Sequence, residues 1–307
     1  MFDAITIGSA ILDVFFKSSQ FQLVKKDGSL ALCETFNEKI EVEQAMISSG
    51  GAGTNVAVGL ARLGFHVACL AEIGKDFAGS VIVHDLEREG VSTELLVQEK
   101  SEATGISGLL ISQDGARTAL VFRGAAQMIT VSDLHSDLLQ TNWIHLSSIG
   151  NTDVISRIFS YCKERHIRLS WNPGNWEIEA IVSGVLKPNW SAVEVLFVNK
   201  EEMEKLSGVS LEGDAWRSEW CFVGPKITVV TDGEHGGRYC IGGKCFWYEG
   251  ERVETVQETG AGDAFAVGFL GGQLTNKEIT QCIEYGKKNA GSVIRSMGAK
   301  TGLLRSL

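Results

Sequence analysis

Proline, basic residues and long apolar runs are all scarce in this chain of 307 residues. Its three prolines argue against a Pro-rich linker or a collagen-like repeat. It has 28 basic and 38 acidic residues, and the resulting formal charge of −10 disfavours nucleic acid and anionic membranes as partners. No uninterrupted apolar run reaches about 18 residues, so no membrane span is predicted. The composition predicts an ordinary globular protein with no nucleic-acid and no membrane partner.

Patterned cysteines and histidines are also missing. The seven cysteines are odd in number, scattered and without a C-x-x-C pair, and the six histidines show no metal-ligand spacing. The first residues run directly into an apolar strand and lack the basic-then-apolar form of a signal peptide. These absences predict a reduced, cytoplasmic protein with ordinary core or surface histidines.

Several familiar motifs are absent as well. No G-x-x-x-x-G-K-[ST] or G-x-G-x-x-G occurs, which disfavours a P-loop fold and an ordinary dinucleotide-binding fold. No H-E-x-x-H or G-x-S-x-G occurs, which removes the best support for a zinc protease or an α/β-hydrolase. Glycine, in contrast, is abundant at 35 residues, about 11% of the chain against about 7% in an average protein. This excess indicates tight turns or backbone that comes close to a ligand.

Strand-like and helix-like segments alternate along the chain. Apolar runs typical of buried strands occur at 4–8, 66–71, 143–146, 167–171, 195–198 and 227–230. Apolar residues on one face predict a helix over 54–64, and helices are also predicted over about 77–89, 261–274 and 276–296. Strands separated by helices form parallel βαβ units. We therefore predict one α/β domain over 1–307, with a mostly parallel central sheet covered on both faces.

Two stretches interrupt this alternation. Residues 14–49 contain short alternating pieces, among them 30–33 and 39–42, which predict antiparallel strands with one solvent-facing side. A second hairpin is predicted over about 104–123, around Asp114-Gly115. Both belong to a small β insertion beside the main sheet.

The sequence Gly260-Ala261-Gly262-Asp263 lies where a predicted helix begins. The first amides of a helix have no internal partner and lie at its positive end, and small residues leave them open to a phosphate. Asp263 could accept a hydroxyl proton while these amides stabilise charge on a transferred group, which is the chemistry of phosphoryl transfer. From the residues alone, the alternative is a glycine-rich helix start with Asp263 as a favourable first-turn charge.

A second cluster, Gly50-Gly51-Ala52-Gly53-Thr54-Asn55, also precedes a predicted helix. Its bare turn could admit a polyhydroxyl ligand, and the Asn55 amide offers both a donor and an acceptor. The alternative is a tight turn in which Thr54 caps the helix.

Together these segments resemble the PfkB (ribokinase-like) family of carbohydrate and nucleoside kinases over nearly the full chain. The matching motifs, spread across about 280 residues, are Gly8–Asp13, Gly50–Asn55, Asn199–Glu202, Thr231–Gly236 and Gly260–Asp263. Asn289 on the last predicted helix matches more loosely, and Trp171–Gly174 resembles the family's Asn-Pro turn near the active site. The resemblance implies a ribokinase-like three-layer α/β/α fold in which residues 14–49 form a β lid.

The same resemblance implies an ATP-dependent kinase that phosphorylates a hydroxyl group. Asp263 would be the general base, and Gly260, Ala261 and Gly262 would form the anion hole. The implied substrate-binding residues are Asp13, Gly50, Gly51, Asn55 and Arg123, and the implied nucleotide-binding residues are Asn199, Thr231, Gly233, Gly236 and Asn289. Mg²⁺ would offset the polyphosphate charge, with Glu202 reaching it through water. The lid would exclude water and, as in relatives, pair with a second copy in a homodimer.

Two departures from the family pattern limit what carries over. Gln257 and Glu258 stand where relatives usually have Asp-Thr. That Asp often helps bind potassium in relatives, so monovalent-cation (K⁺) activation does not follow from the resemblance. Ala52 replaces a lysine that ribokinases proper often carry, which weakens that specific name but leaves the kinase prediction intact.

The residues leave the acceptor open. Arg123 could bind a carboxylate, a phosphate or several hydroxyls, or it could be a surface residue. With Phe122 it resembles the aromatic-Arg pair that is common in fructokinases and 2-keto-3-deoxygluconate kinases. A nucleoside would need an apolar shelf, which Phe15, Phe16 or Phe122 could supply. The leading hypothesis is a kinase of a small sugar, ribose-like or another furanose. The alternatives are a nucleoside kinase, a 2-keto-3-deoxygluconate- or fructose-type kinase, and a non-catalytic sugar- or nucleotide-binding regulator.

Overall fold

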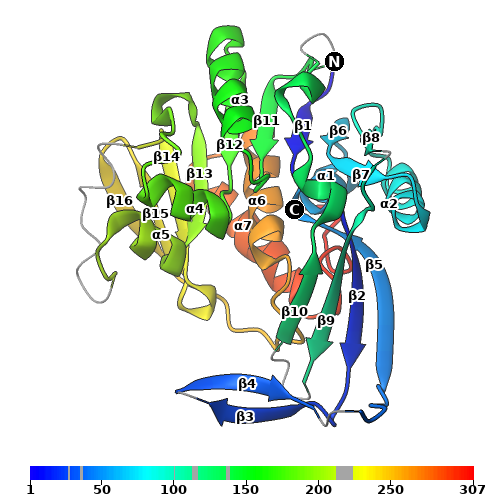
Figure 1. The fold of residues 1–307 in the computed structure, drawn as a ribbon. Helices are drawn as coiled ribbons and strands as arrows, with labels where there is room; N and C mark the ends of the chain where they lie inside the picture. Colours follow the sequence, from blue (N-terminus) through cyan, green and yellow to red (C-terminus); the bar gives the residue numbers. More distant parts are fainter. Residues whose placement is uncertain (27, 35–36, 100, 113–116, 136–138, 212–223) are drawn as a thin grey trace.

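Eight strands form the central sheet of the computed structural model, which describes residues 1–307 except 27, 35–36, 100, 113–116, 136–138 and 212–223. Their order is β16-β15-β14-β13-β12-β11-β1-β6 (Figure 1). Neighbours from β14 to β6 pair in parallel, whereas β15 and β16 continue the sheet antiparallel. The bounds are β1 Ala4–Ile7, β6 Val67–Leu70, β11 Trp143–Leu146, β12 Arg168–Trp171, β13 Val195–Asn199, β14 Ile227–Thr231, β15 Gly237–Ile241 and β16 Lys244–Tyr248.

Buried residues alternate between two hydrophobic cores, one on each face of this sheet. Successive residues of one strand enter different cores, as Ala4 and Ile5 do in β1. The core of Ala4 is completed by α1 (Ala52–Arg62), α2 (Phe77–Arg88), α6 (Ala261–Leu274) and α7 (Ile279–Val293). The core of Ile5 is completed by α3 (Thr152–Arg165), α4 (Asn175–Val182) and α5 (Lys200–Ser207). Helices on both faces of a mostly parallel sheet confirm the predicted three-layer α/β architecture.

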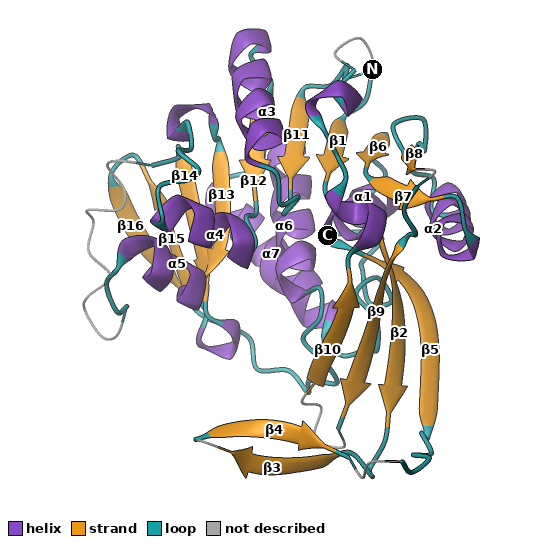
Figure 2. Cartoon of the chain, viewed as in Figure 1, coloured by secondary structure: helices purple, strands orange, loops and turns teal. Residues whose placement is uncertain are grey.

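A second, smaller sheet projects beyond the carboxyl ends of the parallel strands (Figure 2). Its order is β10-β9-β2-β5. Its strands are β2 Ile11–Lys17, β5 Gln44–Gly50, β9 Gly105–Ile111 and β10 Arg117–Phe122, and the hairpin of β3 (Gln22–Lys26) and β4 (Ser29–Cys33) extends from it. A further short pair, β7 (Glu72–Gly74) and β8 (Val97–Glu99), lies near α2. Since β2 follows β1 after three residues and β5 leads into α1, the small sheet is rooted where the main strands end.

The small sheet differs from the sequence prediction in two respects. Residues 39–42, predicted as a strand, form none, and β5 begins only at Gln44, because neither Ile40 nor Val42 is buried. Strand β2 begins at Ile11 rather than at 14, and it pairs parallel with β9 as well as antiparallel with β5. The predicted Asp114-Gly115 turn lies outside the described residues.

Two helices also begin elsewhere than predicted. Helix α1 begins at Ala52, ahead of Thr54, and its N-cap is Gly51 without a side-chain hydrogen bond. The Thr54 hydroxyl donates instead to the Gly50 carbonyl at 2.7 Å. Helix α7 is shorter than the predicted 276–296.

The cysteines contradict the prediction of a fully reduced chain at one pair. Cys240 and Cys245 face each other across β15 and β16, with Cα atoms 4.1 Å apart, and form a disulfide. The scattered spacing hid this pair, because five residues of tight hairpin bring the two side chains together. Cys33, Cys69, Cys162 and Cys282 are free thiols. Among the described residues, no helix has the length and apolar character needed to cross a membrane.

Candidate active site

Two adjoining cavities open where the parallel strands end. The larger, of about 580 Å³, lies between the β14–β15 turn, the start of α6 and the side of α7. The smaller, of about 180 Å³, lies between β13 and the Gly260–Asp263 segment. The residues that line both are Asn199, Thr231, Glu258, Ala261, Gly262 and Phe265. The motifs after β13, after β14 and before α6 are therefore brought together, although they are far apart in the sequence.

The start of α6 leaves backbone donors uncovered. Gly260 is its N-cap with φ 82°, and no side chain caps the helix. A Cβ at Gly260 would lie 2.5 Å from the Ala299 Cβ, whereas one at Gly262 would meet nothing within 4 Å. The Ala261 N–H donates to the Glu258 carbonyl at 3.2 Å, but the amides of Gly262 and Asp263 donate to no described residue. Free N–H groups at a positive helix end suit an anion.

Asp263 lies beside these amides and is half-buried. The Asn55 Nδ2 donates to its carboxylate at 2.8 Å. Burial raises the pKa of Asp263 to about 6, and the Asp13 carboxylate adds to the rise, whereas the Asn55 hydrogen bond and the Lys300 charge oppose it. The Asn55 Oδ1 is buried and has no hydrogen-bond partner in the described part of the chain. This pair therefore combines a carboxylate poised near neutral pH with an acceptor oxygen that is still free.

Asp13, on β2, completes the polar cluster from the small sheet. Its carboxylate accepts a hydrogen bond from the Ser107 hydroxyl of β9, and burial raises its pKa. A Cβ at Gly50 would fall on this carboxylate, so only glycine leaves room for it. Gly51 has φ 92°, and a Cβ there would lie 2.5 Å from the Ser9 carbonyl oxygen. The glycines of β5 and α1 thus shape the place that Asp13 and Asn55 face.

Lys300 is a residue of the site that the sequence analysis missed. It is 4% exposed, donates to the Ser49 hydroxyl and pairs with Asp85 at 3.2 Å. Burial lowers its pKa, while Asp85 and Asp13 oppose that change. Its charge in turn lowers the pKa values of Asp13 and Asp263. The only hint in the sequence is a single lysine within an apolar carboxyl-terminal segment.

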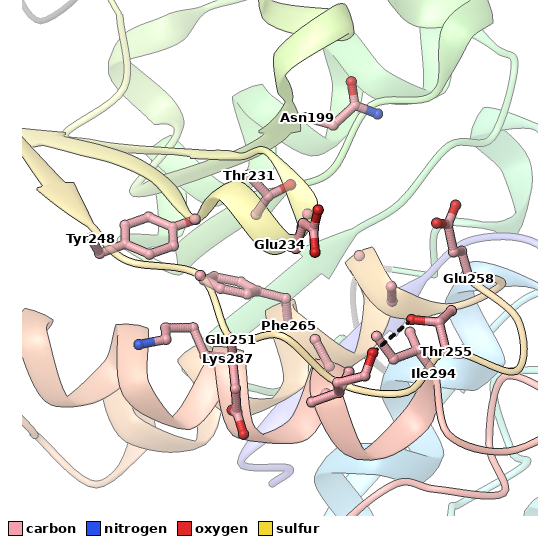
Figure 3. Close-up of a pocket in the computed structure, with 18 of the residues that line it drawn as sticks. Asn199, Thr231, Glu234, Tyr248, Glu251, Thr255, Glu258, Phe265, Lys287 and Ile294 are labelled. Carbon is pink, nitrogen blue, oxygen red and sulfur yellow. Dashed lines mark hydrogen bonds between the residues drawn. The ribbon is translucent and has the colours of Figure 1, made fainter.

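The wall of the larger cavity contains four of the predicted nucleotide-binding residues, Asn199, Thr231, Gly233 and Gly236. Figure 3 shows Asn199 and Thr231 among them. Gly236 has φ 88°, and a Cβ there would overlap the Tyr248 carbonyl. Apolar and small residues of α6 and α7 make the opposite wall, which was not predicted; they are Phe265, Ala290, Gly291 and Ile294. A cavity with polar groups at one side and an apolar wall at the other is typical of a nucleotide site.

Asn199 and Glu202 cap α5 at the edge of the smaller cavity. The Asn199 N–H donates to the Glu202 carboxylate and the Glu202 N–H donates to the Asn199 Oδ1, each at 2.8 Å. Burial raises the pKa of Glu202. Both side chains line the smaller cavity together with Glu258 and Asp263. The Asn-Pro turn after β12 adds Asn172 to this wall.

Six predicted site residues line neither cavity, and they are Asp13, Gly50, Gly51, Asn55, Arg123 and Asn289. Asn289 is fully buried, its Nδ2 donates to the Ala264 carbonyl at 2.7 Å, and its Oδ1 accepts from the Leu304 N–H at 3.0 Å. Its amide therefore joins α7 to α6 and to the carboxyl terminus. Arg123 is exposed just after β10. Arg117, at the start of β10, lines the larger cavity instead.

A model of the pfkB family of carbohydrate kinases matches residues 1–305 of this chain. The chain belongs to the pfkB family. The predicted membership is confirmed, and with it the prediction that the protein is a phosphotransferase acting on a hydroxyl group.

Individual relatives agree with this membership. An uncharacterized sugar kinase of Archaeoglobus fulgidus is 29% identical over 262 residues, which cover 81% of this chain and 100% of the relative. An Arabidopsis thaliana ribokinase solved with ribose and ATP is 20% identical and has a TM-score of 0.79, covering 99% of this chain and 96% of that one. A Burkholderia thailandensis nucleoside kinase solved with inosine is 16% identical, also with a TM-score of 0.79, covering 98% and 95%. The ribokinase-like fold prediction is thereby confirmed.

Proposed function

We propose that this pfkB-family kinase transfers the γ-phosphate of ATP to a hydroxyl group of a small sugar, with Asp263 as the general base. One observation carries the proposal: the half-buried Asp263 carboxylate, whose pKa is raised to about 6, lies at the same helix start as two backbone amides that donate to no described residue. The leading acceptor remains a ribose-like or other furanose sugar. A sugar presents several hydroxyls, which suits the donors and acceptors that Asp13 and Asn55 direct into the site.

The transfer balances as follows. Asp263 takes the proton of the acceptor hydroxyl, the hydroxyl oxygen forms a bond to the γ-phosphorus, and the bond from that phosphorus to the bridging oxygen of ADP breaks. The amides of Gly262 and Asp263 stabilise charge on the transferred group as it passes. With a pKa near 6, Asp263 is mostly ionised at neutral pH and still basic enough to accept the proton.

The larger cavity is the proposed ATP site. Its turn Thr231–Gly236 and the start of α6 face each other across the space, with Phe265 and Ile294 as the apolar side for a base. The carboxylates that line the smaller cavity, Glu202 and Glu258, fit an ion held chiefly by phosphate oxygens, because no described group of three ligating side chains forms a cage of its own. Mg²⁺ bound there would offset polyphosphate charge.

The domain organisation remains a proposal of the same kind. The chain is proposed to be a single kinase domain over 1–307, in which the small sheet is the lid that excludes water from the transfer. The outer strand of that sheet exposes large apolar side chains, which are Leu120, Val121 and Phe122. A second copy covering this strand would give a homodimer through the lid.

A nucleoside is the second candidate acceptor, because the fold is equally similar to the nucleoside kinase solved with inosine. Among the three phenylalanines considered as a shelf for the base, Phe15 is fully buried in the core of the small sheet. Phe16 and Phe122 remain, of which Phe122 is 51% exposed. A 2-keto-3-deoxygluconate- or fructose-type acceptor is the other outcome of the test, whereas the family membership disfavours a non-catalytic regulator.

The test measures ADP release with ATP and Mg²⁺ against a panel of pentoses, hexoses, ketodeoxy acids and nucleosides. Asp263→Asn should lower turnover on the active acceptor by about 1,000-fold or more, because the base is lost, while ATP affinity changes by less than about threefold. The variant should be no less stable, since burial disfavours the carboxylate charge that it removes.

The matched control is Asp153→Asn. Asp153 is also a carboxylate in the first turn of a helix, α3, but it is exposed and lines neither cavity. That control should keep full turnover. If Asp263→Asn keeps full turnover too, Asp263 is only a favourable helix charge and the proposed mechanism is wrong. No ADP release with any acceptor of the panel would contradict the proposed acceptor class.

A further inference from the structure

Gln257 lies where the segment before α6 meets the end of α7. The backbone N–H groups of Val256 and Gln257 both donate to the Ile294 carbonyl, at 2.8 and 3.2 Å. The Gln257 side chain is 1% exposed. Backbone hydrogen bonds and a buried side chain therefore fix Gln257 between the segment before α6 and the end of α7.

The side-chain amide of Gln257 bridges those segments. Its Nε2 donates to the carbonyl oxygens of Thr259 and Ser296, each at 3.2 Å. Its Oε1 accepts from the Thr259 N–H at 2.9 Å. Both Nε2 hydrogens are thus used, and one neutral group joins two backbone carbonyls from different parts of the chain.

This bridge lies directly before the amides that the phosphoryl transfer would use. Gly260, the N-cap of α6, follows Gln257 after two residues and packs so closely on Ala299 that it can carry no Cβ. The position of the Gly262 and Asp263 amides therefore depends on how the 257–259 segment is fixed against the 294–299 segment. A shift of about 1 Å at such a site can cost about 100-fold in rate.

A monovalent cation does not fit this place. Relatives usually carry an Asp here that often helps bind potassium, whereas Gln257 brings no charge to balance a cation. The oxygen atoms of Thr259 and Ser296 face the partial positive charge of the Nε2 hydrogens, and a cation between them would have to displace that group.

We propose that Gln257 is a positioning residue that holds the start of α6 with its amide, and that this kinase therefore works without a monovalent cation. The inference rests on the proposed role of the α6 amides. The bridge replaces an ion, whose binding depends on its concentration, with a covalently attached neutral donor that is always present.

The test compares wild type, Gln257→Asp and Gln281→Asp in about 100 mM KCl and in about 100 mM choline chloride, which keeps the ionic strength equal. Wild-type kcat should differ by less than about twofold between the salts, and its Tm by less than about 1 °C. Gln257→Asp should lose about tenfold in kcat in choline and regain most of it in KCl, because it restores an anionic oxygen ligand. Its Tm should rise by about 3 °C in KCl.

Gln281→Asp is the matched control, because it makes the same substitution at an exposed position of α7 and should respond to neither salt. Activation of the wild type by KCl of about fivefold or more would overturn the inference, even if Gln257→Asp does not fold. A Gln257→Asp variant as active and as stable as wild type in choline would overturn it too. If no preparation phosphorylates any acceptor, the proposed function is wrong. The Tm comparison still shows whether the protein binds K⁺ at this place or whether the Gln257 amide takes its place.

Discussion

Helices α1 and α6 both begin in glycine-rich segments, yet the glycines meet different needs. At α1 they are packed: a Cβ at Gly53 would lie 2.7 Å from the Gly8 carbonyl carbon, and one at Gly50 would fall on the Asp13 carboxylate. At α6, a Cβ at Gly262 would meet nothing within 4 Å. The first glycines let chain segments approach one another, whereas Gly262 leaves space above backbone amides. Both helix starts are thus rich in glycine, one because its surroundings are closely packed and the other because the space above its amides stays open.

Neither start has a side-chain cap. Helices α2, α3 and α5 are capped by the side chains of Asp76, Asn151 and Asn199, whereas α1, α4, α6 and α7 have no side-chain hydrogen bond from the N-cap residue. The hydrogen bond from Asn55 to Asp263 joins the starts of α1 and α6. A missing cap costs about 1 kcal/mol of stability, and a ligand that accepts from the free amides can recover it on binding.

The packed start is the easier one to break. Gly50→Ala should lower kcat/KM for the acceptor by about 100-fold, because the new methyl group displaces the Asp13 carboxylate, while the KM for ATP changes by less than about threefold. Steady-state kinetics with each substrate varied in turn measures both. Gly108→Ala, in β9 of the same sheet, is the control, since its Cβ would make only an ordinary 3.9 Å contact. Equal loss in the two variants would mean that Gly50 matters only for folding.

The open start should respond in the opposite way. Gly262→Ala should fold at least as well as the wild type, because there is room for the methyl group and alanine favours a helix by about 1 kcal/mol over glycine. Turnover should nevertheless fall by about tenfold, because the methyl group covers amides that stabilise the transferred phosphate. Thermal unfolding and kcat test the two effects separately. Unchanged turnover with a raised Tm would show that the space above Gly262 serves no phosphate.

Much of the fold could be predicted because its signals are local. The predicted strand 143–146 and the predicted helix 261–274 have the bounds of β11 and α6, since a short, mostly apolar run marks the strand and a longer apolar run after the glycine-rich start marks the helix. The parallel pairing of β2 with β9 could not be predicted. Ile11 and its partner Gly105 are far apart in the sequence, and the residues of neither strand specify which strand it pairs with. The Cys240–Cys245 pair was missed for a related reason, since register within a hairpin decides it.

Part of the candidate site could be proposed from residue types alone. Asp263 and Asn55 came from glycine-rich segments that the structure brings within 2.8 Å of each other. Lys300 was missed because its partners Ser49 and Asp85 lie 251 and 215 residues away. Asn289 shows the reverse error, because a motif position drew attention to a side chain that the fold uses to join α6 and α7.

The smallest expected effect concerns the hydrogen bond from Asn55 to Asp263, which joins the starts of α1 and α6. Acceptor kcat/KM should fall as the pH drops through about 6, because protonated Asp263 cannot accept the hydroxyl proton. The Asn55 hydrogen bond favours the ionised carboxylate, so Asn55→Ala should move this inflection to higher pH and lower kcat/KM at pH 7 by about threefold. Asn151→Ala, which removes the cap of α3, should leave the inflection where it is. An inflection that stays in place or moves to lower pH in Asn55→Ala would mean that the two glycine-rich starts act independently rather than as one site.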